Sequence, residues 1–405
     1  MLWLYNFGIF FYGLIVRCFS LFNPKARLFV NGRKNLFEQI SSVINPKEKH
    51  VWFHFASLGE FEQGRSVLEK IRQEYPSKKI VITFFSPSGY EIRKNYALAE
   101  GVFYLPLDTH SNALRLVKAI NPELAVFTKY EYWHHYFKAL QQAKVPLFIV
   151  SGIFRPDQIY FKFYGAFYRD ILKKVTHFFV QNKESESLLA SVGLKNVSIA
   201  GDTRLDRVAA NAATPKALPL IEAFCAGKRV CVAGSSWLAD EQLLATLPDR
   251  YTDWKFIIVP HETDEKRIAE VESLFPAATR FSKLSPNHKS AQVMIIDHVG
   301  MLSALYQYAD IAYIGGGFGV GIHNTLEAAA FGIPVIFGPK YQKFQEAKDL
   351  LRTGAASSIS TAAELHTAFD SLKNNHEAGQ SGAAYVAASK GATDLIFTAL
   401  KKYLN

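Results

Sequence analysis

The chain is poor in cysteine and lacks the short motifs that identify many nucleotide-binding enzymes. Its only cysteines are Cys18, Cys225 and Cys231, with no CxxC pair and no His/Cys cluster. This usage excludes a disulfide scaffold and a structural zinc site, and it favours a reducing compartment. GxxxxGK[ST] is absent, and the first strand–helix turn has no GxGxxG. The first absence excludes a P-loop, and the second argues against a dehydrogenase.

The sequence also lacks the composition of a disordered or low-complexity chain. Hydrophobic residues make up 49% and charged residues 20% of its 405 residues, as in a globular protein of two or three domains. The 46 Lys and Arg exceed the 36 Asp and Glu, which gives a net charge of +10. This excess favours an anionic partner, either nucleic acid, anionic lipid or a phosphorylated sugar. No nucleic-acid motif or single basic stripe is present, so we set nucleic acid aside.

Charge is missing from the first 16 residues, MLWLYNFGIFFYGLIV, in which Asn6 is the one strongly polar side chain. Arg17 interrupts the apolar run, which continues to Phe22 and is followed by basic residues. A secretory signal would have its basic residues before the run and a cleavage site after it. We therefore expect residues 1–22 to be an uncleaved membrane anchor that keeps the rest of the chain on the cytoplasmic side. The alternative is a buried N-terminal helix.

From residue 50 the chain alternates short apolar runs with amphipathic segments, as parallel α/β domains do. We expect two Rossmann-like, doubly wound parallel-sheet domains that face a cleft. The predicted parts are an anchor (1–22), a first domain (23–205), an Ala/Pro-rich linker (206–219), a second domain (220–385) and a C-terminal helix (386–405). The predicted strands are 51–55, 79–85, 101–106, 123–128, 146–152, 176–181, 228–235, 254–260, 291–297, 309–316 and 333–339.

Five glycines at residues 315–321 follow a predicted strand, and we expect a helix to begin near His323 and Asn324. Glycines let a backbone approach a ligand closely, and a helix N-terminus offers free N–H groups to a phosphate. Glu327 lies on the same helix face as Asn324, where it suits ribose hydroxyls. Tight packing between strand and helix is the alternative explanation of the glycine run.

Several polar residues follow other predicted strands, where ligands of doubly wound domains bind. Glu60 is placed to act as a general base, although an acidic residue at a helix N-terminus has the same pattern. Glu131 is a second carboxylate at a strand end, among aromatic residues. Ser235 and Ser236 suit either phosphate contacts or helix capping. Arg204 precedes the linker and is placed to reach a phosphate across the cleft.

Taken together, these segments resemble the lipopolysaccharide 3-deoxy-D-manno-octulosonic acid (Kdo) transferases, which are inverting glycosyltransferases of the GT-B type. HFASLGE is similar to the family's H-x-x-S-x-G-E, FTKYEYW to its T-E-x-W region and GDTRLD to its G-N-x-K-x-D. GSSWLADE, VPHE, GIHNTLEAA and GPKYQKFQEA follow in the family's order. The resemblance extends from about residue 50 to residue 350.

The resemblance implies Kdo transfer from CMP-Kdo to a lipid A precursor, without metal or cofactor; no DxD motif occurs. Glu60 would be the general base, and Glu131 and Arg204 would stabilise the transition state. The residues expected to bind the CMP group are Ser235, Ser236, Pro260, His261, Val299, Gly300, Met301, Asn324, Thr325, Leu326 and Glu327.

The sequence departs from the family at three places. Arg204 stands where Lys is usual, Met301 stands where the family has Glu, and Lys129–Tyr130 replaces a Thr-Glu pair. Met301 offers no carboxylate, so CMP contacts at 299–301 would come from the backbone. At these three places, contacts to the acceptor or to the transition state can therefore differ from those of the family.

An anionic membrane surface is a further expected partner, because an acylated acceptor stays in the bilayer. Residues 155–174 interleave Tyr and Phe with basic side chains, which suits lipid headgroups or acceptor phosphates. A packed helix with solvated lysines explains the same pattern. The alternative functions are another GT-B nucleotide-sugar transferase, an epimerase on the same scaffold, or a lipid-binding membrane scaffold without activity.

Overall fold

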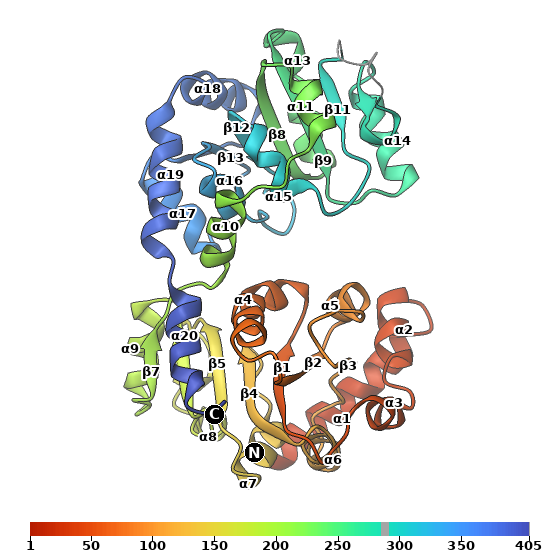
Figure 1. Ribbon diagram of the computed structural model, residues 1–405, viewed down its shortest axis with the longest axis vertical. Helices are drawn as coiled ribbons and strands as arrows, with labels where there is room; N and C mark the ends of the chain where they lie inside the picture. Colours follow the sequence, from red (N-terminus) through yellow and green to blue (C-terminus); the bar gives the residue numbers. More distant parts are fainter. Residues whose placement is uncertain (285–290, 405) are drawn as a thin grey trace. The chain divides into compact units, whose positions relative to one another are not determined.

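The computed structural model describes residues 1–284 and 291–404, and it divides the chain into two compact units (Figure 1). Unit 1 comprises Met1–Asp206 and Lys390–Asn405, and unit 2 comprises Arg207–Ser389. The chain passes into unit 2 at the start of the expected linker 206–219, within helix α10 (Arg204–Ala213). Asn405, the last residue of the expected C-terminal helix, lies outside the described residues.

Unit 1 is built on a seven-stranded parallel sheet of order β3-β2-β1-β4-β5-β6-β7. Every residue of β1 is buried, because helices cover both faces of a doubly wound sheet and leave no solvent-exposed face. The continuous apolar runs of the sequence have the same cause. The strands are β1 (His50–Phe55), β2 (Lys79–Phe84), β3 (Gly101–Tyr104), β4 (Pro122–Thr128), β5 (Leu147–Gly152), β6 (His177–Val180) and β7 (Val197–Ile199).

The helices of unit 1 after the N-terminal one are α2 (Pro24–Asn31), α3 (Leu36–Val43), α4 (Leu58–Glu74), α5 (Pro87–Arg93), α6 (His110–Ile120), α7 (His134–Gln142), α8 (Ala166–Leu172), α9 (Lys183–Ser191) and α20 (Ala392–Lys401). Most of them connect successive strands, while α2 and α3 precede β1 and α20 follows the last strand of unit 2. Helix α20 comes from the end of the chain, packs beside α4 and contributes Ile396, Phe397 and Leu400 to the core on that face of the sheet (Figure 1).

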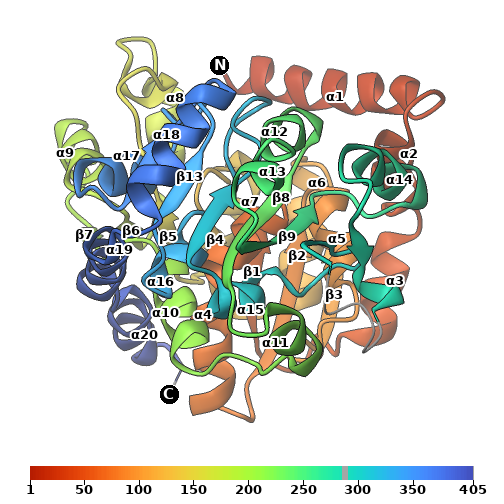
Figure 2. The ribbon, with the colours of Figure 1, turned by 90° about the horizontal axis from the view of Figure 1, so that it is seen from above.

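The apolar N-terminus forms helix α1 (Leu2–Phe19), seen along its length in Figure 2. It is long and apolar enough to cross a membrane, and none of its residues is buried. Polar contacts nevertheless tie its first turns to unit 1. The Tyr5 hydroxyl donates to Asp108 at 2.5 Å, and the Asn6 side-chain oxygen lies 2.7 Å from His135 Nε2. The alternative of a buried N-terminal helix is therefore excluded, because α1 contacts unit 1 but none of its residues is buried.

Unit 2 repeats the architecture with a second seven-stranded parallel sheet, of order β10-β11-β9-β8-β12-β13-β14. Its strands are β8 (Arg229–Ser236), β9 (Trp254–Pro260), β10 (Thr279–Arg280), β11 (Val293–Ile295), β12 (Ile311–Ile314), β13 (Val335–Phe337) and β14 (Ala356–Ser358). The main helices of unit 2 are α10, α11 (Pro219–Cys225), α12 (Leu238–Leu244), α13 (Leu247–Arg250), α14 (Glu265–Leu274), α15 (Leu302–Leu305), α16 (Leu326–Ala330), α17 (Gln345–Arg352), α18 (Ala362–Leu372) and α19 (His376–Ser389).

Two parallel sheets with helical connections confirm the expected α/β fold class and the expected N-terminal helix. The helix expected near His323 and Asn324 begins later, at Leu326, and α16 is only five residues long. The prediction of its start was wrong because Asn324 acts ahead of the helix, where its side-chain oxygen accepts from the backbone N–H of Leu326 at 3.1 Å. A helix this short supplies little dipole to a phosphate.

Candidate active site

Glu60 lies in the first turn of α4, directly beyond the carboxyl end of β1. Its carboxylate accepts a short hydrogen bond from the hydroxyl of Ser57, the N-cap residue of α4. The Glu60 side chain is partly exposed. The pKa of Tyr130 is raised mainly by burial, and the negative charge of Glu60 raises it further. Glu60 is therefore held at an accessible strand end, beside the loop that follows β4.

Glu131 lies in that loop and is held between two aromatic side chains. One of its carboxylate oxygens lies 3.0 Å from Nε2 of His54 and accepts from the indole N–H of Trp133 at 2.8 Å. His54 is fully buried on β1, and its other ring nitrogen lies 2.9 Å from the hydroxyl of Thr83. Since β1 and β4 are neighbours, the sheet itself aligns His54 with Glu131. This clamp fixes the orientation of the carboxylate.

Arg204 follows β7 and is bound by a neighbouring acid. Its guanidinium contacts the Asp202 carboxylate at distances of 2.6 to 3.1 Å. Burial by itself would raise the pKa of Asp202, but the charge and hydrogen bonds of Arg204 outweigh it and lower the pKa. Lys129 adds to that lowering and has a backbone φ of 65°. Arg204 therefore presents a partly neutralised cation, and Lys129 is a second one nearby.

A separate cavity of about 790 Å³ lies in unit 1 between α1 and the loops beyond β3. Its polar lining includes Arg17, Arg33 and Arg115, and its apolar lining includes Ile9 and Leu36. The cavity thus combines positive charge with apolar surface. Arg33 is fixed by backbone oxygens of Phe29, Phe85 and Leu105, at 2.7 to 3.0 Å.

In unit 2, three of the predicted donor-binding residues line one small pocket of about 120 Å³. These are Ser235, Asn324 and Glu327. Asn324 donates to the Glu327 carboxylate at 3.0 Å, so the two side chains form one polar group. Ser235 has a φ of 53°, an uncommon backbone conformation for a residue other than glycine. The remaining lining residues are Gly234, Leu302, Tyr306, Ile314 and His323.

The glycine run serves close backbone packing in the structure. A Cβ on Gly315 would lie 2.3 Å from the carbonyl oxygen of Ser235, and one on Gly317 would lie 2.6 Å from Cα of Gly338. The buried carboxylate of Asp240 fixes the backbone of the glycine run, because it accepts a hydrogen bond from the Gly316 N–H at 2.9 Å. The packing explanation therefore accounts for Gly315 and Gly317.

Three aromatic rings stack beside this pocket. The ring centroids of Trp237 and His261 are 4.7 Å apart, and those of His261 and His323 are 4.4 Å apart. The indole N–H of Trp237 donates to His323 Nε2 at 3.1 Å, so His323 accepts there and carries its proton on Nδ1. Burial lowers the pKa of His261, and it lowers that of His323 to about 4. Both imidazoles are therefore neutral near pH 7.

The other predicted donor-binding residues lie in different settings. Ser236 is fully buried, and its hydroxyl donates to Glu241 at 2.8 Å, so that its side chain is committed to the interior. Thr325 and Leu326 are also buried. Pro260 ends β9, and Val299, Gly300 and Met301 precede α15, with Val299 79% exposed.

Sequence reasoning missed His54, Asp202, Trp237, Asp240 and His323 as parts of these sites. His54, Trp237, Asp240 and His323 act through partners more than 70 positions away in the sequence, whereas Asp202 acts on Arg204, two positions away. The signal available for all five was their place within the matched motifs HFASLGE, GDTRLD, GSSWLADE and GIHNTLEAA.

A family model described as 3-deoxy-D-manno-octulosonic-acid transferase matches residues 31–207. The 3-deoxy-D-manno-octulosonic acid transferase of Haemophilus influenzae is 25% identical over 414 residues, covering 96% of each chain. That of Chlamydia muridarum is 25% identical over 374 residues, covering 89% of this chain and 86% of the relative. The transferase of Aquifex aeolicus is 27% identical, and the match covers 80% of this chain and 85% of the relative.

Solved structures with a similar fold are more distant in sequence. A UDP-N-acetylglucosamine 2-epimerase superposes with a TM-score of 0.58 at 13% identity, covering 83% of this chain and 90% of that one. The UDP-GlcNAc 2-epimerase of Methanocaldococcus jannaschii superposes with a TM-score of 0.55 at 15% identity, and the match covers 84% of this chain and 99% of the epimerase. These likenesses bear on the fold alone, which is GT-B-like.

Proposed function

Because the chain is a glycosyltransferase of the GT-B type related to the Kdo transferases, we propose that it moves Kdo from CMP-Kdo onto a lipid A precursor. The single observation that carries the proposal is the pair of strand-end carboxylates in unit 1, Glu60 and Glu131, each held by its own hydrogen bonds. A scaffold that only binds lipid has no use for two such groups. The full-length relatives give the proposal its substrate class.

In the proposed reaction, an acceptor hydroxyl attacks the anomeric carbon of Kdo from the face opposite the nucleotide. The new C–O bond forms as the bond to the phosphate oxygen of CMP breaks, and the anomeric configuration inverts. Glu60 takes the hydroxyl proton on the oxygen that does not accept from Ser57. The transition state has oxocarbenium character, which the negative charge of Glu131 stabilises. Lys129 and Arg204 compensate charge in the same region.

We assign the CMP group to unit 2, beside the pocket formed by Ser235, Asn324 and Glu327. Glu327 and Asn324 suit the ribose hydroxyls. The stacked rings of Trp237 and His261 offer a flat apolar surface, and Gly300 and Met301 contribute backbone groups. Ser236 contributes through its backbone, because its hydroxyl already donates to Glu241.

We assign the lipid acceptor to the cavity beside α1. An acylated, phosphorylated glucosamine lipid requires both cationic and apolar contacts, and Arg17, Arg33 and Arg115 share the cavity with Ile9 and Leu36. Burial lowers the pKa of Arg33 to about 10, which still leaves it charged at neutral pH. The fixed guanidinium of Arg33 is thus a preorganised contact for an anionic group.

We further propose that α1 lies in the membrane surface rather than crossing the bilayer. Crossing would break the contacts of Tyr5 and Asn6 with unit 1. Its outward face exposes Trp3, Phe7 and Phe10, each by more than half, as an interfacial helix does. This arrangement holds the enzyme on the cytoplasmic face of the inner membrane, where its acceptor is embedded.

Residues 155–174 give partial support to a second membrane contact. Phe163 is 94% exposed and Tyr164 54% exposed, next to Lys162. Arg169 instead donates to backbone oxygens of Tyr160 and Lys162, and Lys173 pairs with Asp170. The proposed contact therefore rests on Lys162, Phe163 and Tyr164. Flotation with anionic vesicles tests it: Phe163→Asp should reduce binding, and unchanged binding would refute this contact.

The test of the function is incubation of detergent-purified protein with CMP-Kdo and a tetraacylated lipid A precursor, followed by mass spectrometry of the lipid. We expect a gain of one or more Kdo masses together with release of CMP. No gain, with both substrates shown to be intact, would contradict the proposal. UDP-N-acetylglucosamine as a second donor then tests the other nucleotide-sugar functions.

A further inference from the structure

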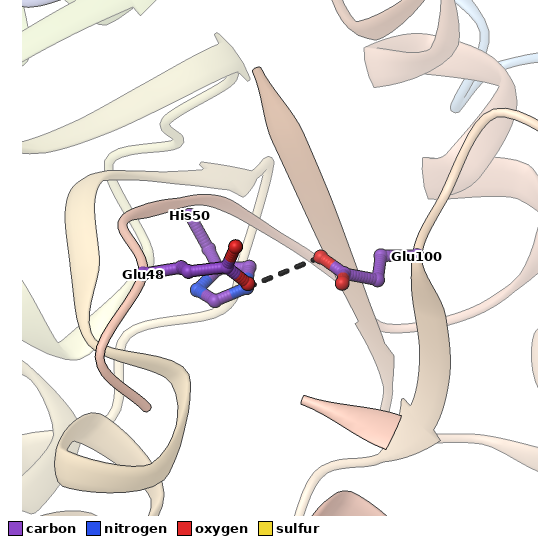
Figure 3. Close-up of side chains that lie close together, drawn as sticks. All are labelled: Glu48, His50 and Glu100. Atoms are coloured by element: carbon purple, nitrogen blue, oxygen red, sulfur yellow. Dashed lines mark ion pairs between the residues drawn. The ribbon is translucent and has the colours of Figure 1, made fainter. Parts of the chain in front are cut away.

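Three side chains that no part of the proposed reaction uses converge at the amino ends of the unit 1 strands. Glu48 lies in the loop before β1, His50 is the first residue of β1, and Glu100 directly precedes β3 (Figure 3). The candidate catalytic residues lie beyond the carboxyl ends of the strands, and therefore at the opposite end of the sheet from this group. Among the described residues, this is the group of three in which all ligand atoms lie within 4.8 Å of one another.

The protonation of His50 leaves a lone pair aimed into this group. His50 is fully buried, and its Nδ1 lies 2.6 Å from the carbonyl oxygen of Ile120. A carbonyl only accepts, so Nδ1 carries the proton and Nε2 of the neutral ring is an acceptor. Nε2 lies 3.2 Å from Oε2 of Glu100, and neither atom has a hydrogen-bond partner within residues 1–284 and 291–404. Two buried acceptors facing each other require a cation or an additional proton between them.

The distance between these atoms matches the distance between two ligands of one metal ion. Ligands at about 2.0–2.1 Å from a tetrahedral zinc ion lie about 3.3 Å from each other, close to the observed 3.2 Å. An imidazole nitrogen and two carboxylates are a usual donor set for zinc. We propose that His50, Glu48 and Glu100 form a binding site for a divalent cation of the zinc type, with water as the fourth ligand.

Lys79 is the competitor for this site. Its ammonium group lies 2.5 Å from Glu48 and 3.1 Å from Glu100, and it supplies positive charge when no metal is bound. The Lys79 side chain is 38% exposed and Glu48 is 40% exposed. The ammonium group can therefore turn into water while the ion enters along Glu48. Removing the lysine charge should strengthen metal binding.

The site links two separate segments of the chain, namely the stretch from Glu48 into β1 and the turn before β3. A metal ion there would hold the amino edge of the sheet together without touching the reacting groups. Kdo transfer should therefore be unaffected by its loss, and a failure of one proposal leaves the other standing. The expectation from cysteine usage, that the chain has no structural zinc site, does not cover a site made of His and Glu.

The experiment is zinc titration of the full-length, chelator-treated protein, with bound metal measured by mass spectrometry after gel filtration. We expect one equivalent of zinc, and a rise in the melting temperature of the protein when zinc is added. His50→Asn keeps a donor for the Ile120 carbonyl but lacks the ligand nitrogen. His50→Asn should weaken zinc binding by more than about 100-fold, because substitution of residues that only hydrogen-bond to a metal ligand already lowers metal affinity by roughly 10–100-fold. Lys79→Gln should bind more tightly.

His177→Asn is the matched control, because His177 also begins a strand of this sheet but pairs with Ser198. It should retain its equivalent of zinc. Wild-type protein that retains no zinc, or zinc retained equally by His50→Asn, would overturn the proposal. Cobalt substitution gives a second readout if His50→Asn fails to fold: tetrahedral absorption bands should appear in wild type and vanish in Glu48→Gln. Bands that persist in Glu48→Gln would also contradict the proposal.

Discussion

The two units share one architecture but hold their charged groups in different ways. In unit 1 the carboxylates of Glu60 and Glu131 lie at strand ends, partly accessible and oriented by neighbouring donors. In unit 2 the carboxylates of Asp240 and Glu241 are fully buried and support the backbone, Asp240 at the glycine run and Glu241 in a pair with Arg267. The rings that face the pocket of unit 2 are neutral at pH 7.

This difference indicates a division of labour between similar folds. Accessible, oriented charge serves proton transfer and transition-state stabilisation, so unit 1 has the features of a catalytic unit. Buried charge and closely packed glycines shape a backbone surface, as a unit that holds a nucleotide requires. Substitutions in unit 1 should therefore change turnover, and substitutions in unit 2 should change stability and donor binding.

The largest expected effect is that of Glu60→Gln. Removal of the proposed general base should reduce turnover by roughly 10²–10⁴-fold. Donor binding, measured by calorimetry with CMP, should stay unchanged, because unit 2 is untouched. Turnover is measured by mass spectrometry of the lipid product.

Glu62→Gln is the control for that substitution, since Glu62 lies on the same helix but pairs with Arg93 at 2.8 Å. Its turnover should stay near that of wild type. Near-normal turnover in Glu60→Gln would refute the role of Glu60 and remove the distinction between the units.

Gly315→Ala should show the contrasting behaviour. The new Cβ would meet the Ser235 carbonyl oxygen at 2.3 Å, so that backbone must move, at a cost of about 1–3 kcal/mol in the free energy of unfolding. Urea unfolding followed by circular dichroism measures the loss. Gly319→Ala is the control, because its nearest atom would lie at 3.5 Å and its stability should stay within about 0.5 kcal/mol of wild type.

Trp133→Phe should sharpen the description of the Glu131 clamp. It removes one hydrogen bond to a charged group, and such bonds contribute about 1.5–3 kcal/mol. We expect kcat to fall at least about tenfold with the KM for the donor unchanged, by steady-state kinetics. Tyr132→Phe should change little, because the buried Tyr132 hydroxyl has no hydrogen-bond partner in the part of the chain that the structure describes. Equal losses in both variants would count against the clamp.

The smallest effect near neutral pH concerns His323, whose pKa is lowered from 6.5 to about 4 by burial and by His261. Between these values the unfolded chain binds a proton that the folded chain does not, so unit 2 loses stability as the pH falls from about 6.5 to 4. Melting temperatures measured across this range should show the decline. The decline should be shallower in His323→Gln, and an unchanged slope would contradict this explanation.

The alternation of apolar runs predicted the two sheets because strands buried on both faces are apolar throughout. It missed β7, β10 and β14, which have two or three residues each at or near a sheet edge. Such strands bury too little apolar surface to leave a pattern. The start of α16 was placed too early because Asn324 resembles a helix residue in sequence, while in the structure it precedes the helix and accepts from the N–H of Leu326.

Part of the candidate site could be found by similar reasoning. Strand ends are visible in the sequence, so Glu60, Glu131 and Ser235 could be singled out as accessible groups. Their partners could not be found from spacing. His54 reaches Glu131 across 77 positions, and the pairing depends on the register of β1 against β4. Burial of the Ser236 hydroxyl against Glu241 likewise depends on how α12 packs.

The return of the chain to unit 1 through α20 has a consequence for biosynthesis. Unit 1 is a discontinuous domain, and Ile396, Phe397 and Leu400 complete its core only after all of unit 2 has been translated. On the ribosome, unit 2 can therefore fold while unit 1 still carries an open apolar groove along α4. Nascent chains stopped after Ser389 should be recognised by chaperones and proteases through unit 1, although most of that unit was made first.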